Sequence, residues 1–257
     1  MATGACRLLR IQQRGYSLRF HPANLSSQLW IDPNEREESL SFLRAYLKPG
    51  DHVIDVGANV GDTVLTASTQ AGRSGRVVGI EAHPTTFDYL RENVALNGAD
   101  NVELIHSAVG AVTGTARFSD DRRDDMNRVD GGDLQMPIER LDRLVPGAQP
   151  VALLKVDVEG YEKFVFDGAT EVLRRTQCVY FEVSAVHFRR FGYCTRNVIE
   201  MLRADGFQVF NTREPGHLSR VDADFDTESF ENLVALRDVQ ECRRRTGWAV
   251  RCECGTD

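Results

Sequence analysis

Cysteine is scarce in this sequence, and it contains no long apolar run and no excess of basic residues. The six cysteines among 257 residues are widely spaced, which argues against a disulfide scaffold and favours free thiols in a reducing compartment. Cys242, Cys252 and Cys254 lack a standard zinc spacing, so we expect no bound metal. No stretch reaches the roughly 18 apolar residues that a membrane-spanning helix needs. We therefore expect a soluble, cytoplasmic protein without a membrane partner.

The charge balance limits the kinds of ligand that the protein could bind. The formal net charge is −7, whereas proteins that bind nucleic acid usually carry a broad basic face. Nucleic acid is therefore not the expected partner, and a small molecule is. The first 31 residues hold several arginines and no acidic residue, so a mitochondrial transit peptide is an alternative to a cytoplasmic location.

Apolar segments of strand length alternate with segments of helical periodicity through most of the chain. Strands are expected over 52–56, 76–81, 102–109, 151–158 and 178–183, with a final pair over 206–210 and 232–236. Helices are expected between them, over 62–70, 84–96, 161–175 and 195–204. This alternation predicts a doubly wound α/β fold, in which a mostly parallel sheet has helices on both faces.

Two segments interrupt the alternation of strands and helices. Residues 1–50, called the leader below, contain one amphipathic helix over 34–47. Residues 113–150 contain a hairpin-like TARF segment followed by the polar run 120–125, and we interpret this segment as an insertion near the ligand site. The sequence therefore predicts a leader that packs on a single domain formed by residues 51–257.

The segment VIDVGANVGD, residues 53–62, is the most informative motif. An apolar strand leads into Gly57, and Gly61 precedes a helix, as at the crossover where doubly wound sheets bind ligands. An ordinary strand-to-helix turn also favours glycine, so the motif alone does not decide. Glu81 ends the next strand about twenty residues later, where a carboxylate can accept hydrogen bonds from both ribose hydroxyls. The two features together predict a cofactor that contains ribose.

The spacing of the glycines and the nearby acids distinguish between two cofactors. A dinucleotide fingerprint reads G-x-G-x-x-G, whereas here Gly57 and Gly61 are separated by three residues. Asp55 and Asp62 flank the turn, and two carboxylates are poorly suited to a doubly negative pyrophosphate. They suit S-adenosylmethionine, which carries an ammonium and a sulfonium. Methyl transfer is therefore favoured over hydride transfer.

The series of motifs resembles the FkbM-type methyltransferases. The matching segments, which lie within residues 35–210, are PGDHVIDVGANVG at 49–61, EAHP at 81–84 with Asn93 and Asn97 downstream, PIERLD at 137–142, LKVDVEG at 154–160, GA at 168–169 and FE at 181–182. The family usually reads EP or EAxP at the second segment, but Glu81 is retained. The resemblance implies a seven-stranded sheet with an antiparallel last strand, S-adenosylmethionine as cofactor, and O-methylation.

The resemblance also assigns ligand contacts by position. It implies that Asp55, Gly57, Asn59 and Gly61 surround the methionine part of the cofactor, and that Glu81 holds the ribose. Ser107 and Ala108 would lie beside the adenine, and Asp157 would lie near the reactive methyl group.

Polar residues gather at the ends of two apolar strands. Lys155, Asp157 and Glu159 alternate along one strand, and Glu182 ends the next strand. These residues could form an ion pair that only orders the strand ends. We favour Asp157, Glu159 and Glu182 as catalytic residues, one of which accepts the proton of an acceptor hydroxyl. His187 is a further candidate base, and two carboxylates could instead bind Mg²⁺, although no third oxygen ligand is evident.

Two other functions have to be compared with methyl transfer. An oxidoreductase that uses NAD would need a Tyr-x-x-x-Lys pair, and Tyr161 and Lys163 lack that spacing. A protein that binds the cofactor without catalysis is the other alternative, and the intact Glu81, Asp157 and Glu182 argue against it. The acceptor is expected to be a hydroxyl of a sugar or secondary metabolite, with the leader, the insertion and the segment 187–195 lining its pocket.

Overall fold

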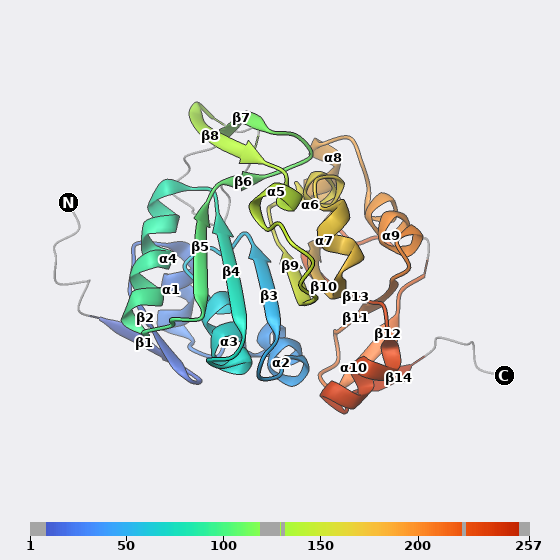
Figure 1. Ribbon diagram of the computed structural model, residues 1–257, viewed down its shortest axis with the longest axis horizontal. Coiled ribbons are helices and arrows are strands. Elements are labelled where there is room, and N and C mark those ends of the chain that lie inside the picture. Colours follow the sequence, from blue (N-terminus) through green and yellow to red (C-terminus); the bar gives the residue numbers. More distant parts are fainter. Residues whose placement is uncertain (1–8, 119–128, 130–131, 223–224, 252–257) are drawn as a thin grey trace.

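The computed structural model describes residues 9–118, 129, 132–222 and 225–251. Within this part of the chain the largest sheet has nine strands in the order β14-β12-β11-β13-β10-β9-β3-β4-β5. Its parallel half consists of β3 (His52–Val56), β4 (Arg76–Glu81), β5 (Val102–His106), β9 (Val151–Val156) and β10 (Thr176–Val183). The carboxyl ends of β3, β4 and β5 point to the same edge of the sheet (Figure 1). This edge is where doubly wound sheets place their ligands.

The other half of the sheet contains the antiparallel strands. β13 (Glu231–Leu236) lies between β10 and β11 (Gln208–Asn211) and runs antiparallel to both. The predicted final strand pair and the antiparallel last strand of the seven are thus present. Two further strands, β12 (His217–Arg220) and β14 (Ala249–Arg251), extend this edge and were not predicted, because each is too short to show a periodic pattern.

Helices cover both faces of the sheet, because neighbouring strand residues point to opposite faces. On β3, Val53 packs with the buried residues of α2 (Glu37–Tyr46), α3 (Asp62–Ala71), α4 (Pro84–Leu96) and α10 (Val239–Thr246). Its neighbour Ile54 packs with those of α5 (Leu141–Leu144), α6 (Glu162–Asp167), α7 (Thr170–Arg174), α8 (Ala185–Arg190) and α9 (Thr195–Ala204). The predicted doubly wound α/β fold is confirmed.

The leader adds structure that its sequence did not predict. Before α2 it forms a hairpin of β1 (Arg10–Gln13) and β2 (Tyr16–Arg19), followed by α1 (Asn24–Ile31). The hairpin lies beside α4 (Figure 1). The Asn93 side chain accepts a hydrogen bond from the backbone of Arg19 at 2.8 Å, and that of Asn97 accepts one from Ser17 at 2.9 Å. The two asparagines of the family pattern therefore hold the leader on α4.

The insertion forms a separate three-stranded sheet in the order β6-β8-β7. It is built from β6 (Ala108–Val109), β7 (Gly114–Phe118) and β8 (Leu134–Glu139), and it lies beyond the carboxyl ends of β4 and β5 (Figure 1). The polar run 120–125 lies outside the described residues, as do Cys252 and Cys254. Cys178 and Cys242 are buried free thiols.

Two predicted elements are broken by the packing. The segment 102–109 is not one strand, because β5 ends at His106 and β6 joins the insertion sheet after Ser107. The helix predicted over 161–175 is divided into α6 and α7 at Gly168. A Cβ atom at Gly168 would lie 2.0 Å from the carbonyl oxygen of Gly110, so the chain turns where the two backbones meet.

Among the described residues, none of the helices combines the length and apolar character needed to cross a bilayer.

Candidate active site

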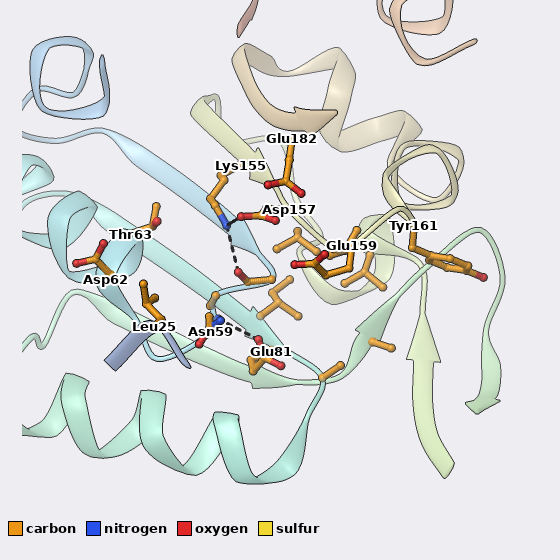
Figure 2. Close-up of a pocket in the computed structure, with 18 of the residues that line it drawn as sticks. Leu25, Asn59, Asp62, Thr63, Glu81, Lys155, Asp157, Glu159, Tyr161 and Glu182 are labelled. Carbon is orange, nitrogen blue, oxygen red and sulfur yellow. Dashed lines mark hydrogen bonds and ion pairs between the residues drawn. The ribbon is translucent and has the colours of Figure 1, made fainter. Parts of the chain in front are cut away.

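A cavity of about 540 Å³ lies at the carboxyl ends of β3, β4, β9 and β10. Most of the predicted site residues line it, namely Gly57, Asn59, Glu81, Ser107, Ala108, Asp157, Glu159 and Glu182. Figure 2 shows Asn59, Glu81, Asp157 and Glu182 around one space, with Asp62 and Thr63 at one end and Glu159 and Tyr161 at the other. Asp55 and Gly61 are not among the lining residues. Their predicted contacts with the cofactor stay predictions, and the structure places both behind the cavity wall.

The turn after β3 depends on residues that tolerate left-handed backbone angles. Gly57 has a φ of 82°, and a Cβ atom there would lie 1.9 Å from the carbonyl oxygen of Asp157. Gly57 therefore allows the turn to pack directly against the end of β9. Asn59 also has a positive φ, of 49°, and Gly61 forms the N-cap of α3 with a φ of 99°. These angles direct the turn around the cavity and lead it into α3.

Glu81 lies at the end of β4 and is almost fully buried. One carboxylate oxygen accepts a hydrogen bond from the backbone N–H of Asn59 at 2.9 Å, and the other accepts one from His83 at 2.8 Å. Burial raises the pKa of this carboxyl, although the two backbone hydrogen bonds oppose the shift. A carboxylate has about four lone-pair positions, so two remain for hydroxyl donors from the cavity. Glu81 is thus held in a fixed orientation that suits a ribose diol.

Lys155 is buried at the end of β9 and carries a positive charge into the site. Its Nζ lies 3.2 Å from a carboxylate oxygen of Asp55, 3.2 Å from one of Asp157, and donates to the Gly57 carbonyl oxygen at 3.1 Å (Figure 2). Burial lowers the pKa of Lys155, but the two aspartates outweigh it, so the pKa is raised. Burial raises the pKa of Asp55 to about 6 against the effect of Lys155. Of the two ion pairs considered from the sequence, Lys155–Asp157 is present and Lys155–Glu182 is not found among the described residues, while Asp55 is an additional partner.

Three ligand-type side chains meet at the other end of the cavity. His187 Nδ1 lies 3.3 Å from a carboxylate oxygen of Glu159, and one ligand atom each from Glu159, Glu182 and His187 lie within 4.8 Å of one another. A third metal-type ligand is therefore present after all, although it is a nitrogen rather than an oxygen. His187 is buried and does not line the cavity. Of the pair Glu159 and His187, only Glu159 therefore faces the cavity.

Glu182 has a strongly perturbed carboxyl group at this end. Burial raises its pKa well above the usual value, and the negative charges of Asp157 and Glu159 raise it further. In its ionised form, a carboxylate with a raised pKa is a stronger base, which suits it to receive a proton from a hydroxyl.

The leader lines the cavity, as expected, but the individual residues that do so were not predicted. Asn24, Leu25, Gln28 and Arg36 line the cavity, as do Asp62 and Thr63 at the start of α3 and Phe230 before β13. Phe118 and Val129 of the insertion also line it, as expected, whereas none of the residues 187–195 does. Only the flanking acid Asp62 had a signal in the sequence. The contacts of α1 depend on tertiary packing that no local pattern records.

The residues around the cavity fit S-adenosylmethionine. Glu81 presents free lone pairs for the ribose, and Ser107 and Ala108 border the position expected for the adenine. Asp62 is buried, and its Oδ2 has no hydrogen-bond partner among the described residues, so a carboxylate oxygen is available to a cationic ligand group. These groups would hold the nucleoside and the amino-acid portion.

Comparison with known proteins agrees with this fit. A family profile described as the Methyltransferase FkbM domain matches residues 55–209, which is more than half of the chain. The hexuronic acid methyltransferase AglP of Haloferax volcanii is 28% identical over 200 residues, covering 72% of this chain and 78% of that protein. An arsenite methyltransferase of Halobacterium salinarum is 36% identical over 66 residues, covering 26% of this chain but only 17% of that protein.

A relative whose name specifies an rRNA substrate also matches, and so does a solved structure. The 23S rRNA (uracil(1939)-C(5))-methyltransferase RlmD of Klebsiella pneumoniae is 40% identical over 60 residues, covering 23% of this chain and 13% of that protein. The crystal structure of a methyltransferase FkbM from Methylobacillus flagellatus KT matches with a TM-score of 0.49 and 14% identity. It covers 75% of this chain and 47% of that one. On the strength of the profile match, the chain belongs to the FkbM family of S-adenosylmethionine-dependent methyltransferases.

Proposed function

We propose that this methyltransferase transfers a methyl group to a hydroxyl of a sugar or another small molecule. The observation that supports this proposal is the group of three carboxylates, Asp157, Glu159 and Glu182, at one end of the cavity (Figure 2). Glu81, which suits the cofactor ribose, and Asp62 lie away from this group. A cofactor held by these residues would direct its methyl group towards carboxylates that can orient and deprotonate an acceptor.

The chemistry places few demands on the protein. S-adenosylmethionine, when bound, supplies a methyl group on a good leaving group, so the chain must mainly align the acceptor oxygen with the methyl carbon. Because a hydroxyl loses its proton as the new bond forms, a nearby base assists the reaction. We assign Glu182 as the proton acceptor, since its pKa is raised and Lys155 makes no ion pair with it within the described residues.

The other two carboxylates are assigned to orientation. Asp157 is paired with Lys155, which fixes its side chain beside the turn where the cofactor is expected. Glu159 is paired with His187 and can accept a second hydrogen bond from an acceptor hydroxyl. Glu159 thus already has a partner in His187, and the proposed mechanism does not require a metal ion.

The walls of the cavity support a small acceptor. Phe118, Val129, Tyr161 and Phe230 add apolar and aromatic surface, and such surface can pack against one face of a sugar ring. The relative that acts on hexuronic acid supports a sugar. The net charge of −7 disfavours the rRNA substrates named for other relatives. We further propose a cytoplasmic enzyme whose residues 51–257 form a single domain.

Mass spectrometry tests the proposed reaction. The purified protein is incubated with S-adenosylmethionine carrying an isotopically labelled methyl group and with a panel of glycosides, uronic acids and hydroxylated metabolites. We expect a labelled methyl ether on at least one hydroxyl acceptor. Label found on nitrogen or carbon atoms, or on rRNA fragments in a parallel incubation, would contradict the proposal.

A further inference from the structure

Arg36 is the residue of the leader with the most unusual position. It forms the N-cap of α2 and lines the cavity, and its side chain is only 30% exposed. The guanidinium Nε is buried and makes no hydrogen bond to any of the residues that the structure describes. Burial lowers the pKa of Arg36, but the carboxylates of Asp62 and Asp157 outweigh it and raise the pKa. A cation is thus held at the wall of the cavity, and its Nε has no direct hydrogen-bonding partner within the described part of the chain.

Asp62 lies next to this cation and has the opposite charge. It is the first residue of α3, and its Oδ2 lies 3.9 Å from Arg36 Nε, too far for a hydrogen bond. Its other oxygen accepts a hydrogen bond from the hydroxyl of Tyr16 on the leader hairpin. Asp62 therefore has a fixed orientation and one unused oxygen, and Arg36 has unused donors, at the same end of the cavity.

We propose that Arg36 and Asp62 bind the two charges of the cofactor's amino-acid portion, with Arg36 donating to the α-carboxylate and Asp62 accepting from the α-ammonium. At a separation of 3.9 Å, Asp62 Oδ2 and Arg36 Nε lie close together without a hydrogen bond, and a zwitterion bound beside the pair could supply a partner to each side chain. An arginine also matches the planar geometry of a carboxylate with two parallel donors. This proposal rests on S-adenosylmethionine being the cofactor.

The position of the pair favours the cofactor over the acceptor as the source of the carboxylate. Asp62 directly follows Gly61 in the turn that starts α3, on the far side of the cavity from Glu159 and Tyr161 (Figure 2). Arg36 precedes the residues 55–209 that match the family profile, so the family pattern does not assign it. The leader would thus supply half of a subsite whose other half lies in the matched domain.

Two ligands that differ in the amino-acid portion test the proposal by calorimetry. S-adenosylhomocysteine carries both charges, whereas 5′-methylthioadenosine retains the nucleoside and the thioether but has neither charge. We expect Arg36→Met to weaken S-adenosylhomocysteine binding at least tenfold and 5′-methylthioadenosine binding less than twofold. Arg36→Lys, which retains the charge, should restore part of the loss, and Asp62→Asn should show the same selectivity as Arg36→Met. Arg14→Met removes an exposed arginine of the same leader and serves as the matched control.

Three results would overturn the proposal. Equal losses for both ligands, reproduced by Tyr16→Phe, would show that the substitutions only loosen the leader. Unchanged affinity of Arg36→Met for S-adenosylhomocysteine would remove Arg36 from the subsite. Loss confined to a carboxylate-bearing acceptor such as methyl glucuronide would assign Arg36 to the acceptor instead. These outcomes are distinct from failure of the proposed O-methylation, because the wild-type protein would still bind the thioether.

Discussion

Replacement of Glu81 is the most direct test of the cofactor site. Its carboxylate is nearly buried and is oriented by the backbone N–H groups of Asn59 and His83, at 2.9 and 2.8 Å. Glu81→Ala removes both the acceptor for the ribose hydroxyls and the acceptor for these two donors. Glu81→Gln keeps the shape but turns one acceptor into a donor, which would face either a backbone N–H or the ribose.

The expected loss of affinity follows from the hydrogen bonds involved. A hydrogen bond to a charged group contributes about 1.5–3 kcal/mol, and two ribose hydroxyls could donate to Glu81. Because two backbone donors already share the charge of the carboxylate, we expect the pair together to contribute about 1.5–3 kcal/mol rather than twice that. Since about 1.4 kcal/mol corresponds to a tenfold change in Kd, Glu81→Ala should weaken S-adenosylhomocysteine binding by tenfold to roughly a hundredfold.

Isothermal titration calorimetry measures this change directly. Glu103→Gln is the matched control, because Glu103 is an exposed acid on the neighbouring strand β5 and pairs only with Arg76 within the described chain. Its affinity for S-adenosylhomocysteine should equal that of the wild type. A Kd for Glu81→Ala within twofold of the wild-type value would refute the assignment of the ribose. Binding of NAD without any response to the thioether would refute the assignment of the cofactor.

Three further predictions concern catalysis and stability. Asp157→Asn should abolish turnover while S-adenosylhomocysteine affinity stays within a few-fold, and full activity in a methyl-transfer assay would remove Asp157 from the mechanism. Gly57→Ala should cost more than about 3 kcal/mol in urea unfolding, because strain adds to a backbone clash, whereas Gly98→Ala, with positive φ but open space, should cost about 1 kcal/mol. Burial raises the pKa of Glu162 to about 7 from a usual 4.5, so the folded state binds the extra proton and loses stability as pH rises between these values. The free energy of unfolding of Glu162→Gln should therefore rise relative to that of the wild type by up to about 3 kcal/mol between pH 5 and 7, and it should rise no further above pH 7. A difference between the two proteins in thermal denaturation that does not vary with pH would contradict this.

The central sheet could be predicted because its strands are buried on both faces. Such strands form continuous apolar runs, as in β3 and β9, and they are separated by helices with clear periodicity. The boundaries of α4 and α9 follow from Pro84 and from a helical pattern that ends at Ala204. The broken elements could not be predicted, since the division at Gly168 depends on a backbone approach from Gly110, distant in the sequence.

In the candidate site too, some residues could be predicted from the sequence and others could not. The residues that end strands, such as Glu81, Asp157 and Glu182, could be identified because parallel strands bring their carboxyl ends to one edge. The pairing of Lys155 with Asp157 was one of the alternatives considered from the sequence, whereas its pairing with Asp55 could not be read from it, because Asp55 lies on a different strand whose register with β9 is a property of the sheet. The leader was expected to line the acceptor pocket, but no local pattern marked α1 itself.

Charge balance explains why Lys155 and Arg36 matter beyond their own contacts. The cavity and the layer behind it contain the carboxylates of Asp55, Asp62 and Asp157, and burying unpaired charges of one sign is costly. Lys155 compensates Asp55 and Asp157 at β9, and Arg36 is the cation nearest to Asp62 within the described chain. A leader that lost Arg36 would leave Asp62 with the Tyr16 hydrogen bond and the charges of Arg44 and Lys155, and burial would then raise the pKa of Asp62 further. The leader therefore has an electrostatic reason to remain packed on α3, in addition to its apolar contacts.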